Sequence, residues 1–108
     1  MLDNIAKVAD MSELFENSEI KSYYGDTTAM DISPCTVRIG EGMVSLTYAY
    51  SGGEQTYAGT EIGEGHYKLE TSAGDGKANL HHFKGGQILD GWWVEDGHEG
   101  MWRITLHR

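Results

Sequence analysis

Apolar and polar residues alternate in short runs along the chain from residue 35 onward. Trp102, Ile104 and Leu106 fall on one face of such a run, and Val44 and Leu46 share a face in another. Clusters of glycine separate the runs at intervals of about eleven or twelve residues. This pattern predicts short antiparallel strands joined by tight hairpins, because every second side chain of a strand points to the same face. The predicted strands are 35–39, 43–51, 55–62, 66–71, 77–83, 87–95 and 101–107, with an eighth possible at 20–24.

The connections between these runs are short and nearly equal in length. They leave no room for crossover helices, so the sheet cannot be parallel. Asp75-Gly76 and Asp96-Gly97 are predicted hairpin turns, because both central residues of a type I′ turn need positive φ. A meander of seven or eight strands twists, and closure removes its exposed edges. The predicted fold class is mainly β, an up-and-down barrel or strongly curled sheet; an α+β roll is the alternative, and a jelly roll or sandwich is third.

The first residues of the chain carry a different pattern, with apolar residues three and four positions apart. Leu2, Ile5, Ala6 and Ala9 follow this spacing, and Asp3 is placed to cap its start. The pattern predicts a helix over residues 2–16 that packs on the sheet or closes one end of a barrel. A helix that binds a partner is the alternative interpretation.

Length and charge restrict the class of protein. The chain has 108 residues, the size of a single domain spanning 1–108. Seventeen acidic residues against eight basic ones give a net charge of −9 with histidine neutral. Nucleic acid and anionic membranes would repel such a chain, so neither is expected as a partner. No stretch approaches the ~18–20 apolar residues of a membrane span, and no signal-peptide pattern is present, so we expect a cytoplasmic protein.

Two segments near the end of the sequence combine glycine with tryptophan. They are Asp-Gly-Trp-Trp at 90–93 and Gly-His-Glu-Gly-Met-Trp at 97–102. Together they resemble the Gly-x-Trp turns of small calycin barrels such as lipocalins and avidins. In lipocalins the motif lies near the start of the chain, whereas here it lies near the end. The resemblance implies a calycin-like up-and-down barrel and carries no functional residue with it.

Few residues point to catalysis or metal binding. Cys35 is the only cysteine, which excludes an internal disulfide and a cysteine-based zinc site. No serine elbow, phosphate loop or dinucleotide fingerprint is present, so no catalytic residue is assigned. His66 and His81 are expected as cross-strand neighbours on the outer face, where a carboxylate would complete a weak metal site. Solvated or hydrogen-bonded histidines are the favoured interpretation, and neither a metal nor a cofactor is predicted.

Aromatic residues give the main signal for a ligand. Tyr48 and Tyr50, with His82 and Trp92, are predicted to line a cavity that has an apolar wall and a few polar points. The alternative is that these side chains simply fill the interior. Both remain open, because eight strands is the size at which a barrel is either filled or holds one small ligand.

Asp90 lies in an apolar run, Ile-Leu-Asp-Gly-Trp-Trp-Val at 88–94. If its face points inward, it is a buried carboxylate that could act as an acid, a base or a ligand anchor. The favoured alternative is a bulge at Gly91 that turns Asp90 outward. The acidic turn at 95–99 is interpreted as a solvated hairpin whose charges prevent edge pairing.

Three functions follow from these features. The first is a barrel that binds one small apolar or aromatic molecule. The second is a structural or interaction module, in which a homodimer covers strand edges or an exposed tryptophan. The third is a small α+β-roll enzyme, which would need Asp90 and His82 on one inner face for proton transfer. A non-enzymatic function is favoured.

Overall fold

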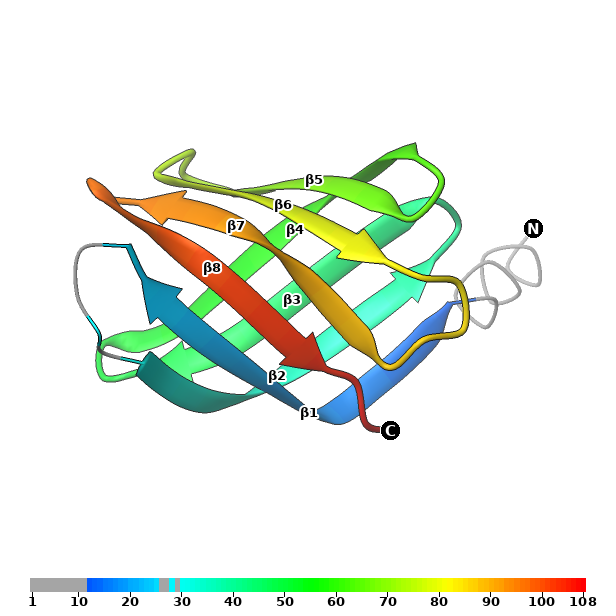
Figure 1. Ribbon diagram of the computed structural model, residues 1–108, viewed down its shortest axis with the longest axis horizontal. Coiled ribbons are helices and arrows are strands. Elements are labelled where there is room, and N and C mark those ends of the chain that lie inside the picture. Colours follow the sequence, from blue (N-terminus) through cyan, green and yellow to red (C-terminus); the bar gives the residue numbers. More distant parts are fainter. Residues whose placement is uncertain (1–11, 26–27, 29) are drawn as a thin grey trace, which may run out of the picture.

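The computed structural model describes residues 12–25, 28 and 30–108, and these residues form a closed barrel of eight strands. Figure 1 shows the strands running alternately up and down around one axis. Among the described residues there is no helix, and therefore none suited to cross a membrane. The strands are β1 (Glu13–Tyr24), β2 (Met30–Gly40), β3 (Met43–Tyr50), β4 (Gly53–Gly63), β5 (His66–Thr71), β6 (Gly76–His82), β7 (Ile88–Glu95) and β8 (His98–Thr105).

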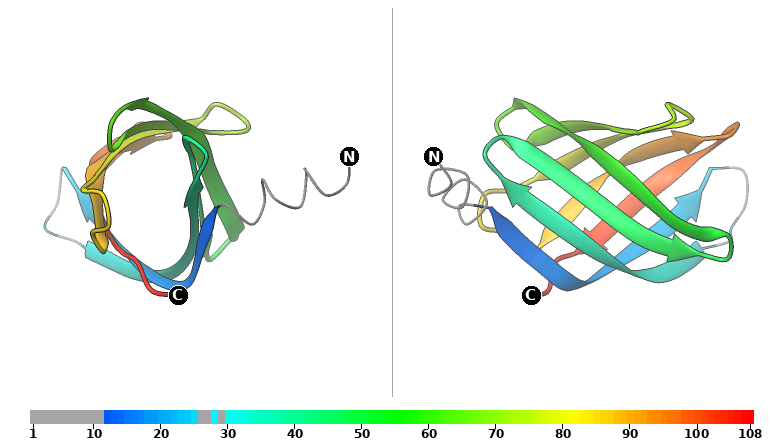
Figure 2. Two further views of the ribbon diagram at one scale, coloured as in Figure 1. Left: turned by 90° about the vertical axis from the view of Figure 1, so that its right-hand side faces the viewer. Right: turned by 180° about the vertical axis from the view of Figure 1, so that it is seen from behind.

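Each strand pairs antiparallel with the next, and β1 pairs with β8 to complete the ring. The end-on view in Figure 2 shows this closure. The predicted antiparallel meander is confirmed. Of the predicted alternatives, the curled open sheet, the α+β roll and the sandwich are not what the described residues form. Closure is favourable because it leaves no unpaired strand edge.

Period-two alternation places one set of side chains inside the barrel, as predicted. Val37, Leu46 and Ile104 are 0% exposed, and Trp102 is 2% exposed. Cys35 belongs to the same core and is a free, buried thiol. Leucine, isoleucine and valine side chains therefore fill the middle of the barrel, as expected for this strand number.

Two inward-facing glycines let neighbouring strands approach closely. A Cβ added at Gly91 would lie 1.7 Å from the backbone oxygen of Asn79, and one added at Gly100 would lie 1.7 Å from that of Tyr23. No side chain fits at these distances. Glycine is therefore required where these neighbouring strands approach most closely.

The same glycines create space for two tryptophans. Gly91 is the cross-strand partner of Trp102, and Gly100 is the partner of Trp93. The two indole rings stack with centroids 6.0 Å apart and planes inclined by 20°. The two Gly-x-Trp segments thus lie side by side on β7 and β8 and pack their rings into the interior.

One predicted turn is confirmed. Asp96 has φ of 50° and Gly97 has φ of 80°, and they join β7 to β8 as a two-residue hairpin. This is the positive φ pair that a type I′ turn requires.

The other predicted turn, Asp75-Gly76, is wrong. Gly76 is the first residue of β6, and the positive φ of this loop, 77°, is at Gly74. The Thr71 hydroxyl donates a hydrogen bond to Asp75 Oδ1 (2.6 Å) and accepts one from the Gly76 N–H (3.0 Å). A side chain therefore holds a longer loop in place of a two-residue turn.

The predicted N-terminal helix is wrong over its last residues. Residues 13–16 belong to β1, and residues 2–11 lie outside the described part of the chain. The pairing of β1 with β2 shifts register between Phe15 and Ser18. This bulge moves the inward-facing residues from odd to even positions. The sequence of β1 therefore shows no continuous period-two alternation. Pairing with β2 extends the strand back to Glu13, well before the predicted 20–24, whereas β8 pairs only with residues 19–24.

Candidate functional site

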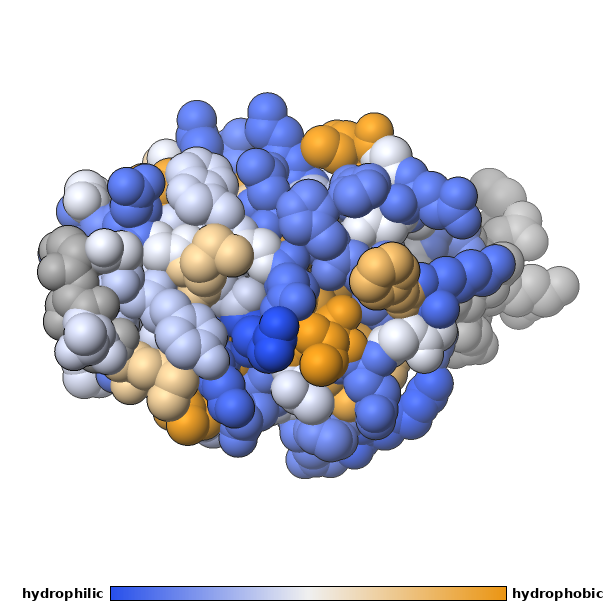
Figure 3. Space-filling model, viewed as in Figure 1, coloured by the Kyte–Doolittle hydropathy of each residue, from blue (hydrophilic) through white to orange (hydrophobic). Residues whose placement is uncertain are grey.

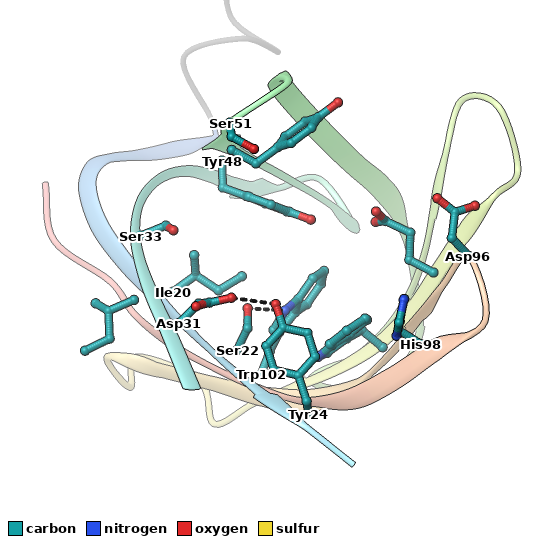
Figure 4. A pocket seen from close by; sticks show the side chains of 14 residues that line it. Ile20, Ser22, Tyr24, Asp31, Ser33, Tyr48, Ser51, Asp96, His98 and Trp102 are labelled. Atoms are coloured by element: carbon teal, nitrogen blue, oxygen red, sulfur yellow. Dashed lines mark hydrogen bonds between the residues drawn. The ribbon is translucent and has the colours of Figure 1, made fainter. Parts of the chain in front are cut away.

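A cavity of about 450 Å³ opens at the end of the barrel where β1, β3 and β7 end and β2 and β8 begin. Figure 4 shows polar and aromatic side chains from these strands facing the opening. We call this space the mouth cavity. Its lining consists of Ile20, Ser22, Tyr24, Asp31, Ile32, Ser33, Tyr48, Tyr50, Ser51, Trp93, Glu95, Asp96, His98 and Trp102.

Aromatic rings separate the mouth cavity from the aliphatic core. Trp102 meets Tyr57 edge to face at 4.9 Å and Tyr48 at 6.1 Å, measured between ring centroids. Tyr24 meets Trp93 in the same way at 5.5 Å. Edge-to-face pairs place neighbouring rings at steep angles, so the rings form a rigid floor and wall.

Hydrogen bonds hold the polar groups of the lining in place. The Tyr24 hydroxyl donates to Asp31 Oδ2 (2.5 Å), as the dashed line in Figure 4 shows. The Tyr57 hydroxyl donates to Glu95 Oε1. The Trp102 indole N–H donates to Ser22 Oγ (3.0 Å). These bonds hold three polar residues of the lining, Ser22, Asp31 and Glu95, in position.

Three tyrosines at or beside the cavity, Tyr24, Tyr48 and Tyr57, have raised pKa values. Burial raises the pKa of Tyr48, and the charge of Glu95 raises it further. Burial also raises the pKa of Tyr57, followed by its hydrogen bond to Glu95. The hydrogen bond to Asp31 raises the pKa of Tyr24 to about 12, with burial adding to the effect. At neutral pH these phenols therefore keep their protons and present neutral rings.

The structure brings together two of the five residues predicted to line a ligand site. Tyr48 and Tyr50 both line the mouth cavity. His82 lies at the far end of the barrel, where its Nε2 is 2.7 Å from the carbonyl oxygen of Gly86. Trp92 points outward and is 38% exposed.

Asp90 also lies on the outer face, but not because of a bulge. The pairing of β7 with both neighbours runs without a register shift through Gly91. Simple alternation turns Asp90 outward, where it forms a two-pronged ion pair with Arg103 (2.9 and 3.2 Å). Asp90 is paired across the strands with His81 and not with His82. The shared inner face that the acid–base alternative requires is therefore absent.

His66 and His81 are cross-strand neighbours on the outer face, as predicted. Their Nδ1 atoms lie 2.6 Å apart, so one ring donates a hydrogen bond to the other. No group of three or more histidine, cysteine, aspartate or glutamate side chains gathers in metal-binding geometry within residues 12–25, 28 and 30–108.

Sequence reasoning missed the acidic and serine side chains of the cavity. Glu95 was assigned to a solvated turn, yet it follows Trp93 by two residues and faces the same interior. Asp31 and Ser33 precede Cys35 in the same way on β2. Continuing the period-two pattern to the ends of the strands would have found them. Because these residues are polar, their local sequence suggests that they face solvent and not the interior.

The outer surface carries two further features. His82 and Asp90 line a separate hollow of about 380 Å³, in which the two main charged groups, Asp90 and Arg103, are already paired with each other. Tyr23, Met101 and Trp92 are cross-strand neighbours on β1, β8 and β7, each exposed by 38–53%. Figure 3 shows a pale to tan area over these strands. We call these three residues the outer aromatic row.

Comparison with known proteins gives no family for this chain. No protein-family model, no curated protein and no solved structure matches it.

Proposed function

We propose that the protein binds one small, mostly apolar or aromatic molecule in the mouth cavity. The observation that carries the proposal is a cavity of about 450 Å³ with an aromatic floor and fixed polar groups at its rim. Small-molecule sites are of this size, and half of the lining residues here, seven of fourteen, are aliphatic or aromatic. The calycin-like interpretation of the Gly-x-Trp segments agrees with a barrel that holds its ligand at one end.

The packed core limits how deep a ligand can lie. Leu46, Leu69, Leu80, Leu89 and Ile104 are 0% exposed and occupy the middle of the barrel. A ligand in the mouth cavity would therefore rest on Trp93 and Trp102 with its polar end toward the rim. One or two fused rings fit such a space.

The first test is native mass spectrometry of protein purified under gentle conditions. A reproducible added mass of a few hundred daltons on the monomer would support the proposal and give the ligand class. The second test is an NMR titration with naphthylmethanol, a neutral aromatic probe. About 0.4 kcal/mol for each of its twelve non-hydrogen atoms gives a Kd on the order of 0.3 mM.

The three tryptophans provide an internal control for this titration. The indole N–H signals of Trp93 and Trp102 should shift, whereas that of the outward-facing Trp92 should not. Ser33→Trp places a ring in the cavity and should abolish the shifts. Thr36→Trp, on the outer face of the same strand, should leave them unchanged. Equal shifts of all three signals, or none, would contradict the proposal.

A homodimer is the second candidate, and the outer aromatic row is the observation that favours it. Exposed aromatic and methionine side chains are enriched at protein interfaces. The same mass spectrum separates the two functions, since a dimer without added mass would favour association. In that case Met101→Lys should return the protein to a monomer.

A further inference from the structure

The ionisable groups of the mouth cavity are nearly all acidic. Asp31 and Glu95 occupy inward positions of β2 and β7, and Asp96 lies in the adjoining turn. Among the described residues that line the cavity, none is a lysine or an arginine, and His98 is the remaining ionisable group besides the tyrosines. A hollow lined by charges of one sign concentrates ions of the opposite sign. The cavity therefore repels anions and attracts cations.

Hydrogen bonds from neutral hydroxyl groups, and not ion pairs with basic side chains, hold the two carboxylates in place. Asp31 accepts a hydrogen bond from Tyr24, and Glu95 accepts one from Tyr57. The carboxylates are thus held in position, and among the described residues neither forms an ion pair with a basic side chain. The charge of Glu95 also raises the pKa of both Tyr48 and Tyr57.

The aromatic rings add a second attraction for positive charge. Trp93 and Trp102 form the floor, and Tyr24 and Tyr48 meet them edge to face with planes inclined by 88° and 75°. Rings set at steep angles to one another form the sides of a box. The faces of aromatic rings are electron-rich and attract an ammonium group, most strongly where water is displaced.

We infer that the mouth cavity selects a small organic cation, an amine or quaternary ammonium group carried on an apolar or aromatic body. The inference rests on the proposed function and adds the charge of the ligand to it. The carboxylates attract the cationic group at the rim, and the indoles of Trp93 and Trp102 contact the apolar body.

A metal ion is a poorer match for the same charges. No cluster of three ligating side chains exists among the described residues, and the tyrosine hydroxyls already occupy one oxygen of Asp31 and one of Glu95. Calcium and magnesium need six or more oxygen ligands in close geometry. An organic cation needs only a negative field and ring faces.

Three probes that share a naphthalene ring and are similar in size differ mainly in charge. Comparing their affinities measures how the charge of the ligand affects binding. Naphthylmethylamine is a cation at pH 7, naphthylmethanol is neutral and naphthoate is an anion. Isothermal titration calorimetry at low salt, with the indole N–H signals as the readout of site, gives their affinities. We expect the amine to bind about tenfold or more tightly than the alcohol, and naphthoate to bind weakest. The advantage of the amine should shrink as salt is added.

Variants that each remove one negative charge show which carboxylates favour binding of the amine. Asp31→Asn and Glu95→Gln should each weaken binding of the amine about threefold to tenfold, and weaken binding of the alcohol by a smaller factor. Glu16→Gln, at the opposite end of the barrel, is the matched control and should change neither affinity. Retained binding of the alcohol also shows that the variants keep the cavity intact.

The outcomes separate the inference from the function on which it rests. If the alcohol binds in the cavity and the amine binds no better, the inference is wrong and the proposed function stands. Preference for naphthoate would overturn the inference in the same way. If neither the amine nor the alcohol binds, both the inference and the proposed function fail.

Discussion

Trp102 belongs both to the buried core and to the lining of the mouth cavity. Replacing it gives a quantitative test of which strand faces point into the barrel. Its side chain is 2% exposed, and it contacts Tyr48, Tyr57 and Trp93 through their rings. Trp102→Ala deletes this packing and leaves a void, which costs about 3–5 kcal/mol of the free energy of unfolding. The lost hydrogen bond to Ser22 adds little, because Ser22 borders the cavity and water can replace the indole N–H.

The assay is urea unfolding followed by far-UV circular dichroism. With an m-value of about 2 kcal/mol/M, a loss of ~4 kcal/mol lowers the urea midpoint by about 2 M. Trp102→Phe keeps a ring in place and should lose roughly half as much. This variant remains measurable even if Trp102→Ala does not fold.

Trp92→Ala is the matched control, since Trp92 is the same residue type on the outer face of the neighbouring strand and is 38% exposed. It should lose less than about 1 kcal/mol. Equal losses at the two tryptophans, or a loss below about 1 kcal/mol for Trp102→Ala, would refute the assignment of inner and outer faces.

Three further changes test other parts of the structure. Gly100→Ala should lower the urea midpoint strongly, because its Cβ would lie 1.7 Å from the Tyr23 oxygen at the strand pair that closes the barrel; a wild-type midpoint would argue against closure. Burial raises the pKa of the Cys35 thiol to about 12, so iodoacetamide at pH 8 should modify it about a thousandfold more slowly than the unfolded chain, and rapid native-state labelling would contradict its burial. Asp90→Asn should barely shift the urea midpoint, because its ion pair with Arg103 is solvent-exposed, whereas a large shift would assign Asp90 a structural role.

The inner faces of β3, β5 and β8 were predictable because these strands alternate without interruption. Leu46, Leu69 and Trp102 fall on the inner face in both the pattern and the structure. Cross-strand pairing of His66 with His81 also followed, because a short loop between adjacent strands restricts the register. Period two and turn length are local properties of the sequence, so they can be read without knowing the fold.

β1 and the mouth cavity were not predictable in the same way. The bulge between Phe15 and Ser18 changes the inward face of β1, and pairing with β8 comes from the other end of the chain. The cavity gathers Asp31 and Glu95 from strands far apart in sequence, and both look like ordinary surface acids in their local context.

The antiparallel meander, most of its strands and many of its core residues could be predicted from the amino-acid sequence. These follow from period-two alternation and from glycine at the turns, which act over a few neighbouring residues. The three-dimensional fold was needed to establish that the sheet closes, that Asp90 and Trp92 lie outside and that carboxylates and rings meet at one end. Closure and register depend on contacts between distant strands, and a shift of one residue exchanges the two faces of a strand.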